Sequence, residues 1–130
     1  MIFVDSSVWI DYVNDLDTPQ TQKLDSFLGL RSVVIGDLVM AEVLQGCDDP
    51  KLFRVTEQLF ERLDFTIVGG YHLAVVAAKN YVFLRAKGIT IRKTVDTLIA
   101  SHCILRGFEL LHNDRDFRPF AQHLGLKCVI

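Results

Sequence analysis

The chain alternates short, continuous apolar runs with longer stretches in which apolar residues recur at helical spacing. The short runs predict buried strands at residues 2–4, 33–35, 65–68 and 108–112, and a further edge strand at 127–130. Turn and capping residues separate these runs from the helical stretches. Those stretches predict helices at residues 6–14, 18–30, 36–46, 50–63, 71–87 and 94–106, and a short one at 114–123.

Continuous apolar strands that alternate with helices are typical of a parallel sheet covered on both faces. The pattern therefore predicts the α/β class, with a central, mainly parallel sheet of about four to five strands. In such sheets ligands bind beyond the carboxyl ends of the strands. Residues that directly follow a strand are therefore the first candidates for chemistry.

Acidic side chains occur at these positions. Asp5 directly follows the first predicted strand, and Asp114 and Asp116 follow the fourth. Glu42 and Asp96 lie on helical stripes that also carry apolar residues, so both are expected to face the sheet. Each acid alone has an ordinary structural explanation. Asp96 would interact favourably with the dipole at the start of its helix, Asp114 could cap the short helix that follows it, and Glu42 could be exposed to solvent.

Convergence of these acids would favour a bound cation. Carboxylates held close together repel one another and raise one another's pKa, and a divalent cation relieves that repulsion. A ligand set made only of oxygen selects a hard ion such as Mg²⁺ or Mn²⁺. Such an ion lowers the pKa of bound water and neutralises charge on a phosphodiester.

The charges are distributed unevenly along the chain, although the net charge is only −2. Residues 1–64 carry 12 acidic and 5 basic side chains, whereas residues 65–130 carry 4 acidic and 9 basic ones. This asymmetry makes a polyanionic partner a candidate. The other interpretation is that two oppositely charged faces improve solubility or pair with a second protein. Arg92 and Lys93 precede the Asp96 helix, where they either hold backbone phosphates of a polyanionic partner or belong to a solvated loop.

The chain of 130 residues is expected to form one domain, residues 1–130, with a core of its own. No apolar run is long enough to span a membrane, and the three cysteines show no C-x-x-C spacing. We therefore expect a cytoplasmic protein with buried thiols and no membrane association. The glycine-rich phosphate loops and the G-x-S-x-G motif are absent, which argues against a nucleotide cradle and a serine hydrolase.

Four segments together resemble the motifs of the PIN domain family, and within it the VapC toxins of prokaryotic VapBC toxin–antitoxin modules. They are residues 3–11 (FVDSSVWID), 38–44 (LVMAEVL), 95–100 (VDTLIA) and 110–117 (LLHNDRDF). They occur in the order and spacing of the family, and the resemblance spans nearly the whole chain. His112 replaces a threonine that is commoner in the family, and it is either a neutral filler or a phosphate contact.

The resemblance implies a PIN-like α/β/α sandwich and an endoribonuclease dependent on Mg²⁺ or Mn²⁺, with transfer RNA or ribosomal RNA as substrate. The acidic quartet of the family and its accessory residues correspond to Asp5, Glu42, Asp96 and Asp114, and to Ser6 and Asp116. In this interpretation Asp5, Asp96 and Asp114 hold the metal ion. Glu42 binds the ion or orients the attacking water.

The resemblance also implies a toxin of a type II toxin–antitoxin system, with a VapB-type antitoxin across the site and a symmetric homodimer. Trp9, Tyr12, Val13 and Phe27 are candidates for a groove that receives an antitoxin helix, unless they belong to the core. The alternatives are a PIN-domain nuclease without an antitoxin, a non-catalytic nucleic-acid-binding module, and a receiver-like signalling domain. The last would require an acid pair near Asp5 and a lysine at a late strand end, and the sequence has neither.

Overall fold

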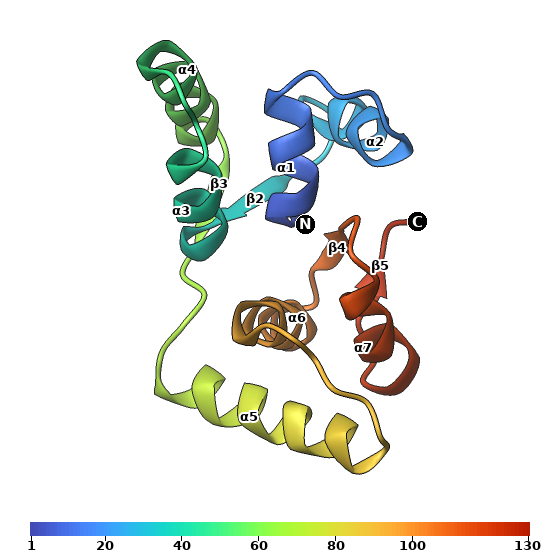
Figure 1. The fold of residues 1–130 in the computed structure, drawn as a ribbon. Helices are drawn as coiled ribbons and strands as arrows, with labels where there is room; N and C mark the ends of the chain where they lie inside the picture. The colour runs from blue at the N-terminus through green and yellow to red at the C-terminus, as the bar shows by residue number, and fades with distance from the viewer.

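A five-stranded parallel sheet lies at the centre of the computed structural model, which describes residues 1–130 (Figure 1). The strands are β1 (Ile2–Val4), β2 (Val33–Gly36), β3 (Asp64–Thr66), β4 (Glu109–Leu111) and β5 (Lys127–Cys128). Their order across the sheet is β3-β2-β1-β4-β5. The predicted α/β class and the parallel sheet are therefore confirmed.

Helices cover both faces of this sheet. They are α1 (Ser6–Val13), α2 (Pro19–Phe27), α3 (Asp37–Gln45), α4 (Pro50–Glu61), α5 (Tyr71–Ala86), α6 (Thr94–Arg106) and α7 (Arg118–His123), with a 3₁₀ turn η1 (Arg115–Phe117) before α7. In Figure 1, α1 to α4 lie on one side of the sheet, and α5, α6 and α7 lie on the other. Right-handed crossovers account for this division, because the chain moves from β1 outward to β3 and then returns across the sheet to β4 and β5.

Local signals determine where the helices begin and end. Thr18 and Asp49 accept backbone hydrogen bonds in the first turns of α2 and α4, each directly before a proline. Helix α2 ends at Phe27, earlier than the predicted end at residue 30. The chain turns there at Gly29, whose φ of +87° favours glycine.

The third strand is shifted from the apolar run at 65–68 that predicted it: it begins one residue earlier and ends two residues earlier. Strand β3 pairs with β2 over Asp64–Thr66, and Phe65 and Ile67 are exposed. Beyond β3, Val68 donates its N–H to the carboxylate of Asp37 at 2.8 Å rather than to a strand. The prediction of these bounds was wrong because two of the three apolar side chains in this run lie at the surface.

The core packs against both faces of β1 and β2, whose residues are all buried. Trp9 of α1 is fully buried, and its ring meets that of Phe60 of α4 at a centroid distance of 5.1 Å. Trp9 is therefore a core residue and not part of an exposed groove. All three cysteines are free thiols, but only Cys103 is buried as expected, whereas Cys47 and Cys128 are half-buried. None of the helices is both long and apolar enough to cross a membrane.

Candidate metal centre

Strands β1 and β4 bring two of the predicted acids to one edge of the sheet. Val4 lies opposite Leu111 in the parallel register, and the N–H of Asp5 donates to the carbonyl oxygen of Leu111 at 3.0 Å. Asp114 follows shortly after β4. The carboxyl ends of two neighbouring strands therefore carry Asp5 and Asp114, at the edge where a parallel sheet binds ligands.

Three carboxylates form the most compact group at this edge. One oxygen each of Asp96, Asp114 and Asp116 lies within 4.8 Å of the others. Asp96 comes from the first turn of α6 and is only 7% exposed. Asp114 caps η1, and its Oδ1 accepts the N–H of Asp116 at 2.9 Å. This tight turn places Asp116 beside Asp114, so the residue expected to be accessory lies within the compact group.

Asp5 and Glu42 adjoin this group without belonging to it. The negative charge of Asp5 contributes to a raised pKa at both Glu42 and Asp96, and Asp114 contributes to that of Asp96. Oδ2 of Asp5 is already engaged at the start of α1, where it accepts the N–H and the hydroxyl of Ser7 at 3.1 and 2.7 Å. The structure thus brings together the four acids of the expected quartet, with Asp116 added to them.

Burial and mutual repulsion disfavour ionisation in this cluster. Burial, followed by the charges of Asp5 and Asp114, raises the pKa of Asp96 to about 6. Burial and then the charge of Asp5 raise the pKa of Glu42. In addition, Oδ2 of Asp96 and Oε1 of Glu42 are buried without a hydrogen-bond partner. Buried oxygens that lack donors, in a ligand set made only of oxygen, fit a hard divalent cation.

The two predicted basic residues face the acids. Arg92 Nε donates to Asp116 Oδ2 at 3.0 Å, and this ion pair raises the pKa of Arg92 further. The charge of Lys93 acts to lower the pKa of both Glu42 and Asp96. Arg92 therefore already has a carboxylate partner, and the field of Lys93 partly offsets the repulsion in the cluster.

Adjacent serines link the site to the two strand ends. The hydroxyl of Ser7 donates to Asp5 and accepts the N–H of Asn113 at 3.1 Å, which joins the end of β1 to the end of β4. Ser6, the predicted accessory residue, is buried and places its hydroxyl near Glu42, where it acts to lower the pKa of that carboxyl. Ser7 was missed, and its only signal in the sequence was its position two residues after Asp5.

His112 supports the backbone of the site. It is buried, its ring lies against Phe117 at a centroid distance of 5.0 Å, and its Nδ1 accepts the N–H of Asp114 at 3.2 Å. Burial lowers the pKa of His112. The side chain is therefore more than a filler, because it holds the turn that positions Asp114.

A helix-covered parallel sheet with carboxylates at the ends of its central strands defines an α/β protein with an acidic cation site. The chain belongs to the PIN domain family, whose model matches residues 2–122. It is 28% identical to ribonuclease VapC11 of Mycobacterium tuberculosis, over 99% of this chain and 98% of the relative.

Solved structures show the same fold. VapBC2 of Rickettsia felis, bound to a DNA fragment from its promoter, matches with a TM-score of 0.76 and 20% identity, over 99% of this chain and 98% of the other. A toxin–antitoxin complex from Klebsiella pneumoniae matches with a TM-score of 0.66 and 18% identity, over 100% and 97%.

Proposed function

We propose that this protein is a metal-dependent endoribonuclease and the toxin of a type II toxin–antitoxin pair. The observation that carries the proposal is the pair of buried, unpartnered oxygens of Asp96 and Glu42 within an all-oxygen cluster. Membership of the PIN domain family and the ribonuclease name of the M. tuberculosis relative support the reaction. The substrate class is RNA, and the bond cleaved is the phosphodiester.

Asp5, Asp96 and Asp114 are the proposed ligands of a Mg²⁺ or Mn²⁺ ion, and Asp116 completes the cluster. When bound, such an ion lowers the pKa of water and neutralises charge that develops on the phosphodiester. Glu42 orients the attacking water and accepts its proton, a role that its raised pKa favours. Lys93, whose charge acts on Glu42 and Asp96, offsets part of the negative charge when RNA approaches.

RNA cleavage with controlled metal content tests this proposal. We expect no cleavage of purified tRNA or ribosomal RNA in EDTA, and recovery with Mg²⁺ or Mn²⁺ but not with Ca²⁺ at equal concentration. Ca²⁺ prefers more ligands at longer distances, so it should bind without supporting the reaction. Asp96→Asn serves as the inactive control. Cleavage that persists after exhaustive chelation would contradict metal dependence.

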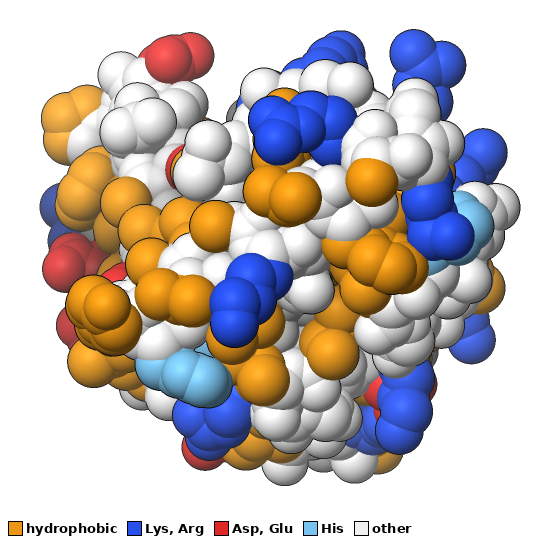
Figure 2. Space-filling model, turned by 90° about the horizontal axis from the view of Figure 1, so that it is seen from below, with side chains coloured by type: hydrophobic (Ala, Val, Ile, Leu, Met, Phe, Trp, Pro, Cys, Tyr) orange, Lys and Arg blue, Asp and Glu red, His pale blue; other side chains and the backbone are white.

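The proposed partner is a VapB-type antitoxin, and two of the similar structures are named as VapBC or toxin–antitoxin complexes. Because Trp9 is buried, the proposed groove consists of Tyr12, Val13 and Phe27, which are half-buried on α1 and α2. We also propose a homodimer, and the face that carries α5 is a candidate for the contact between the two copies. Figure 2 shows hydrophobic side chains on this face, and Tyr71 and Val82 of α5 are exposed.

We expect a short reading frame for the antitoxin next to this gene, and co-expression with its product tests the partner. We expect a stable complex and inhibition of RNA cleavage, and Tyr12→Ala should weaken both. Light scattering of the free protein at micromolar concentration should give the mass of a dimer, and a monomer would contradict that part of the proposal.

A further inference from the structure

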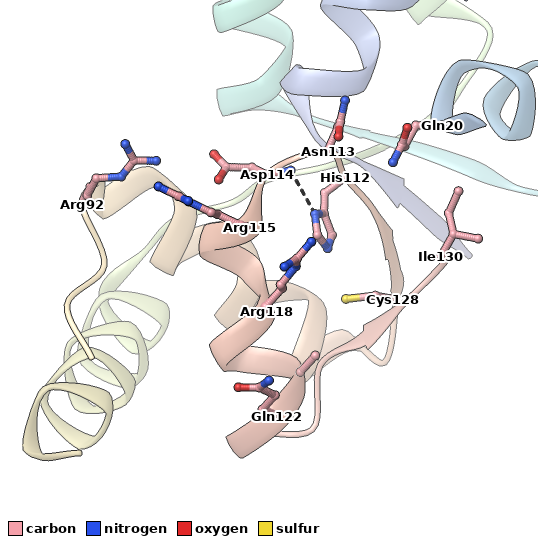
Figure 3. Close-up of a pocket in the computed structure, with 11 residues that line it drawn as sticks. Gln20, Arg92, His112, Asn113, Asp114, Arg115, Arg118, Gln122, Cys128 and Ile130 are labelled. Carbon is pink, nitrogen blue, oxygen red and sulfur yellow. Dashed lines mark hydrogen bonds between the residues drawn. The ribbon is translucent and has the colours of Figure 1, made fainter. Parts of the chain in front are cut away.

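An open cavity of about 680 Å³ lies directly beside the acidic cluster, and Asp114 belongs to both (Figure 3). Its walls come from the turn after β4, from η1 and α7, from the end of the chain, from the start of α2 and from the loop before α6. Its lining includes the side chains of Arg115, Arg118, His112, Asn113, Gln122 and Ile130. We call this cavity the arginine pocket.

The arginine pocket is positively charged, although it adjoins an acidic site. Three arginines, Arg92, Arg115 and Arg118, line it, and Asp114 is the only acidic side chain among the lining residues. Arg92 is paired with Asp116, whereas Arg115 and Arg118 are exposed and take part in neither of the two ion pairs of the structure. Two guanidinium groups are therefore free to bind an anion from outside the molecule.

The two free arginines lie in neighbouring parts of the pocket. Arg115 begins η1 and Arg118 begins α7, three positions further along the chain. In Figure 3 the Arg118 guanidinium lies beside the ring of His112, and Arg115 lies nearer Asp114. Because Nδ1 of His112 accepts the N–H of Asp114, the neutral ring carries its proton on Nε2, which is a further donor.

Several other side chains that line the arginine pocket are uncharged. Gln122 and Asn113 carry amides that can both donate and accept hydrogen bonds, as the edges of nucleobases do. Cys128 and Ile130 add apolar surface, and Ile130 is exposed. The volume of the pocket lies in the range of ordinary small-ligand sites, and a nucleotide fits within it.

We propose that the arginine pocket holds one unstacked nucleotide of single-stranded RNA, next to the phosphodiester that is cleaved. Arg118 and Arg115 bind the phosphate of this nucleotide, and its base extends toward Gln122. The inference rests on the proposed ribonuclease function, and it deepens that function by naming the pocket and the arginines that position the RNA strand. A base can enter the pocket only if it leaves the stack, which a loop or a single strand permits and a duplex does not.

The same pocket explains how RNA approaches a cluster of carboxylates. An RNA strand that reaches Asp96 and Asp114 meets repulsion from both, even when a cation neutralises part of their charge. Arg115 and Arg118 attract the neighbouring phosphate and fix the register of the strand without contacting the bond that is cleaved. They are therefore positioning residues for the proposed reaction, and substitution of either should act on RNA binding.

Equilibrium RNA binding tests the arginine pocket. The protein carries Asp96→Asn to prevent cleavage, and the probe is a fluorescent single-stranded RNA of about ten nucleotides. We expect Arg118→Gln and Arg115→Gln each to weaken binding about 5- to 20-fold at low salt, and to reduce the slope of log affinity against log salt by about 0.7. The duplex of the same sequence should bind more weakly than the single strand, and should respond less to either substitution.

Arg54→Gln is the matched control, because Arg54 is an exposed arginine on α4, on the other side of the sheet. If Arg118→Gln and Arg115→Gln bind the single strand as Arg54→Gln does, the arginine pocket is not an RNA subsite. The same conclusion follows if these variants lose affinity only for an antitoxin.

Cleavage by the unsubstituted protein separates this inference from the proposed function. If that protein cleaves RNA while Arg118→Gln leaves both binding and cleavage unchanged, the function holds and the pocket inference fails. If it cleaves no RNA but both arginine variants still weaken binding, the nucleotide site holds and the ribonuclease proposal fails.

Discussion

Replacing Asp96 with asparagine should stabilise the metal-free protein while it abolishes RNA cleavage. The substitution removes one negative charge from the compact carboxylate group and keeps the size and shape of the side chain. The pKa of Asp96 is raised from 3.8 to about 6, first by burial and then by the charges of Asp5 and Asp114. At neutral pH the folded, metal-free protein therefore carries an ionised carboxylate that its surroundings disfavour.

The size and sign of the effect follow from proton linkage. Because the pKa of Asp96 is higher in the folded than in the unfolded chain, the folded state binds more protons between about pH 4 and pH 6. Its free energy of unfolding therefore falls as the pH rises through that window. The pKa difference corresponds to at most about 3 kcal/mol. Solvent screens the neighbouring charges at this open edge, so we expect about 1–2 kcal/mol.

Urea unfolding at several pH values, in EDTA, measures this contribution. We expect Asp96→Asn to be about 1–2 kcal/mol more stable than the unsubstituted protein at pH 7–8, and the difference to disappear near pH 4. The comparison at each pH cancels the titration of Glu42 and other groups. Added Mg²⁺ should raise the melting temperature of the unsubstituted protein, and this rise should be lost in the variant.

Asp64→Asn is a suitable control, because Asp64 is exposed at the start of β3, and none of the ion pairs involves it. It should change stability little at any pH and leave the Mg²⁺ response intact. The reasoning is refuted if Asp96→Asn is less stable than the unsubstituted protein at pH 7. It is also refuted if the stability difference is constant from pH 4 to pH 8.

Two further substitutions test the support of the site. Asp5→Ala should lower the free energy of unfolding by about 0.5–2 kcal/mol because α1 loses its cap, whereas Asp5→Asn keeps an acceptor oxygen and should change it by less than about 0.5 kcal/mol. Both variants should lose cleavage, so an active Asp5→Asn would remove Asp5 from the site. Gly36→Ala should cost about 1–3 kcal/mol, because an added Cβ would lie 2.9 Å from the Phe3 ring. At Gly46 an added Cβ meets nothing within 3.4 Å, so Gly46→Ala is the control, and equal stability of the two alanine variants would contradict the packing argument.

The sheet and the positions of the acids were accessible from the sequence, because few properties of the chain determine them. Four short apolar runs separated by helices are consistent with a parallel sheet covered on both faces. Once the sheet is parallel, residues after β1 and β4 must meet at one edge, and these residues include Asp5 and Asp114. The apolar stripes beside Glu42 and Asp96 then indicated that these helical acids face the same edge.

The finer arrangement of the site depends on turns that apolar periodicity does not encode. Asp116 joins the compact group because Asp114 caps a single 3₁₀ turn. The sequence of residues 113–117 (NDRDF) does not by itself determine this geometry. Arg92 could be recognised as basic and near the site, but its ion pair with Asp116 depends on the path of the loop before α6. The arginine pocket was missed because Arg115 and Arg118 come next to Arg92, His112 and Ile130 only in the folded chain.

Helix capping and cation binding need not compete for the same aspartate. Asp5 caps α1 through Oδ2, and Asp114 caps η1 through Oδ1, so each carboxylate keeps a second oxygen for another partner. The cap orients the side chain before any ligand arrives, which reduces the conformational entropy that binding must overcome. An aspartate also has one rotatable bond fewer than a glutamate, so its oxygens follow the backbone closely. The capping signals that made these acids look ordinary in the sequence are thus the contacts that hold them in place for a cation.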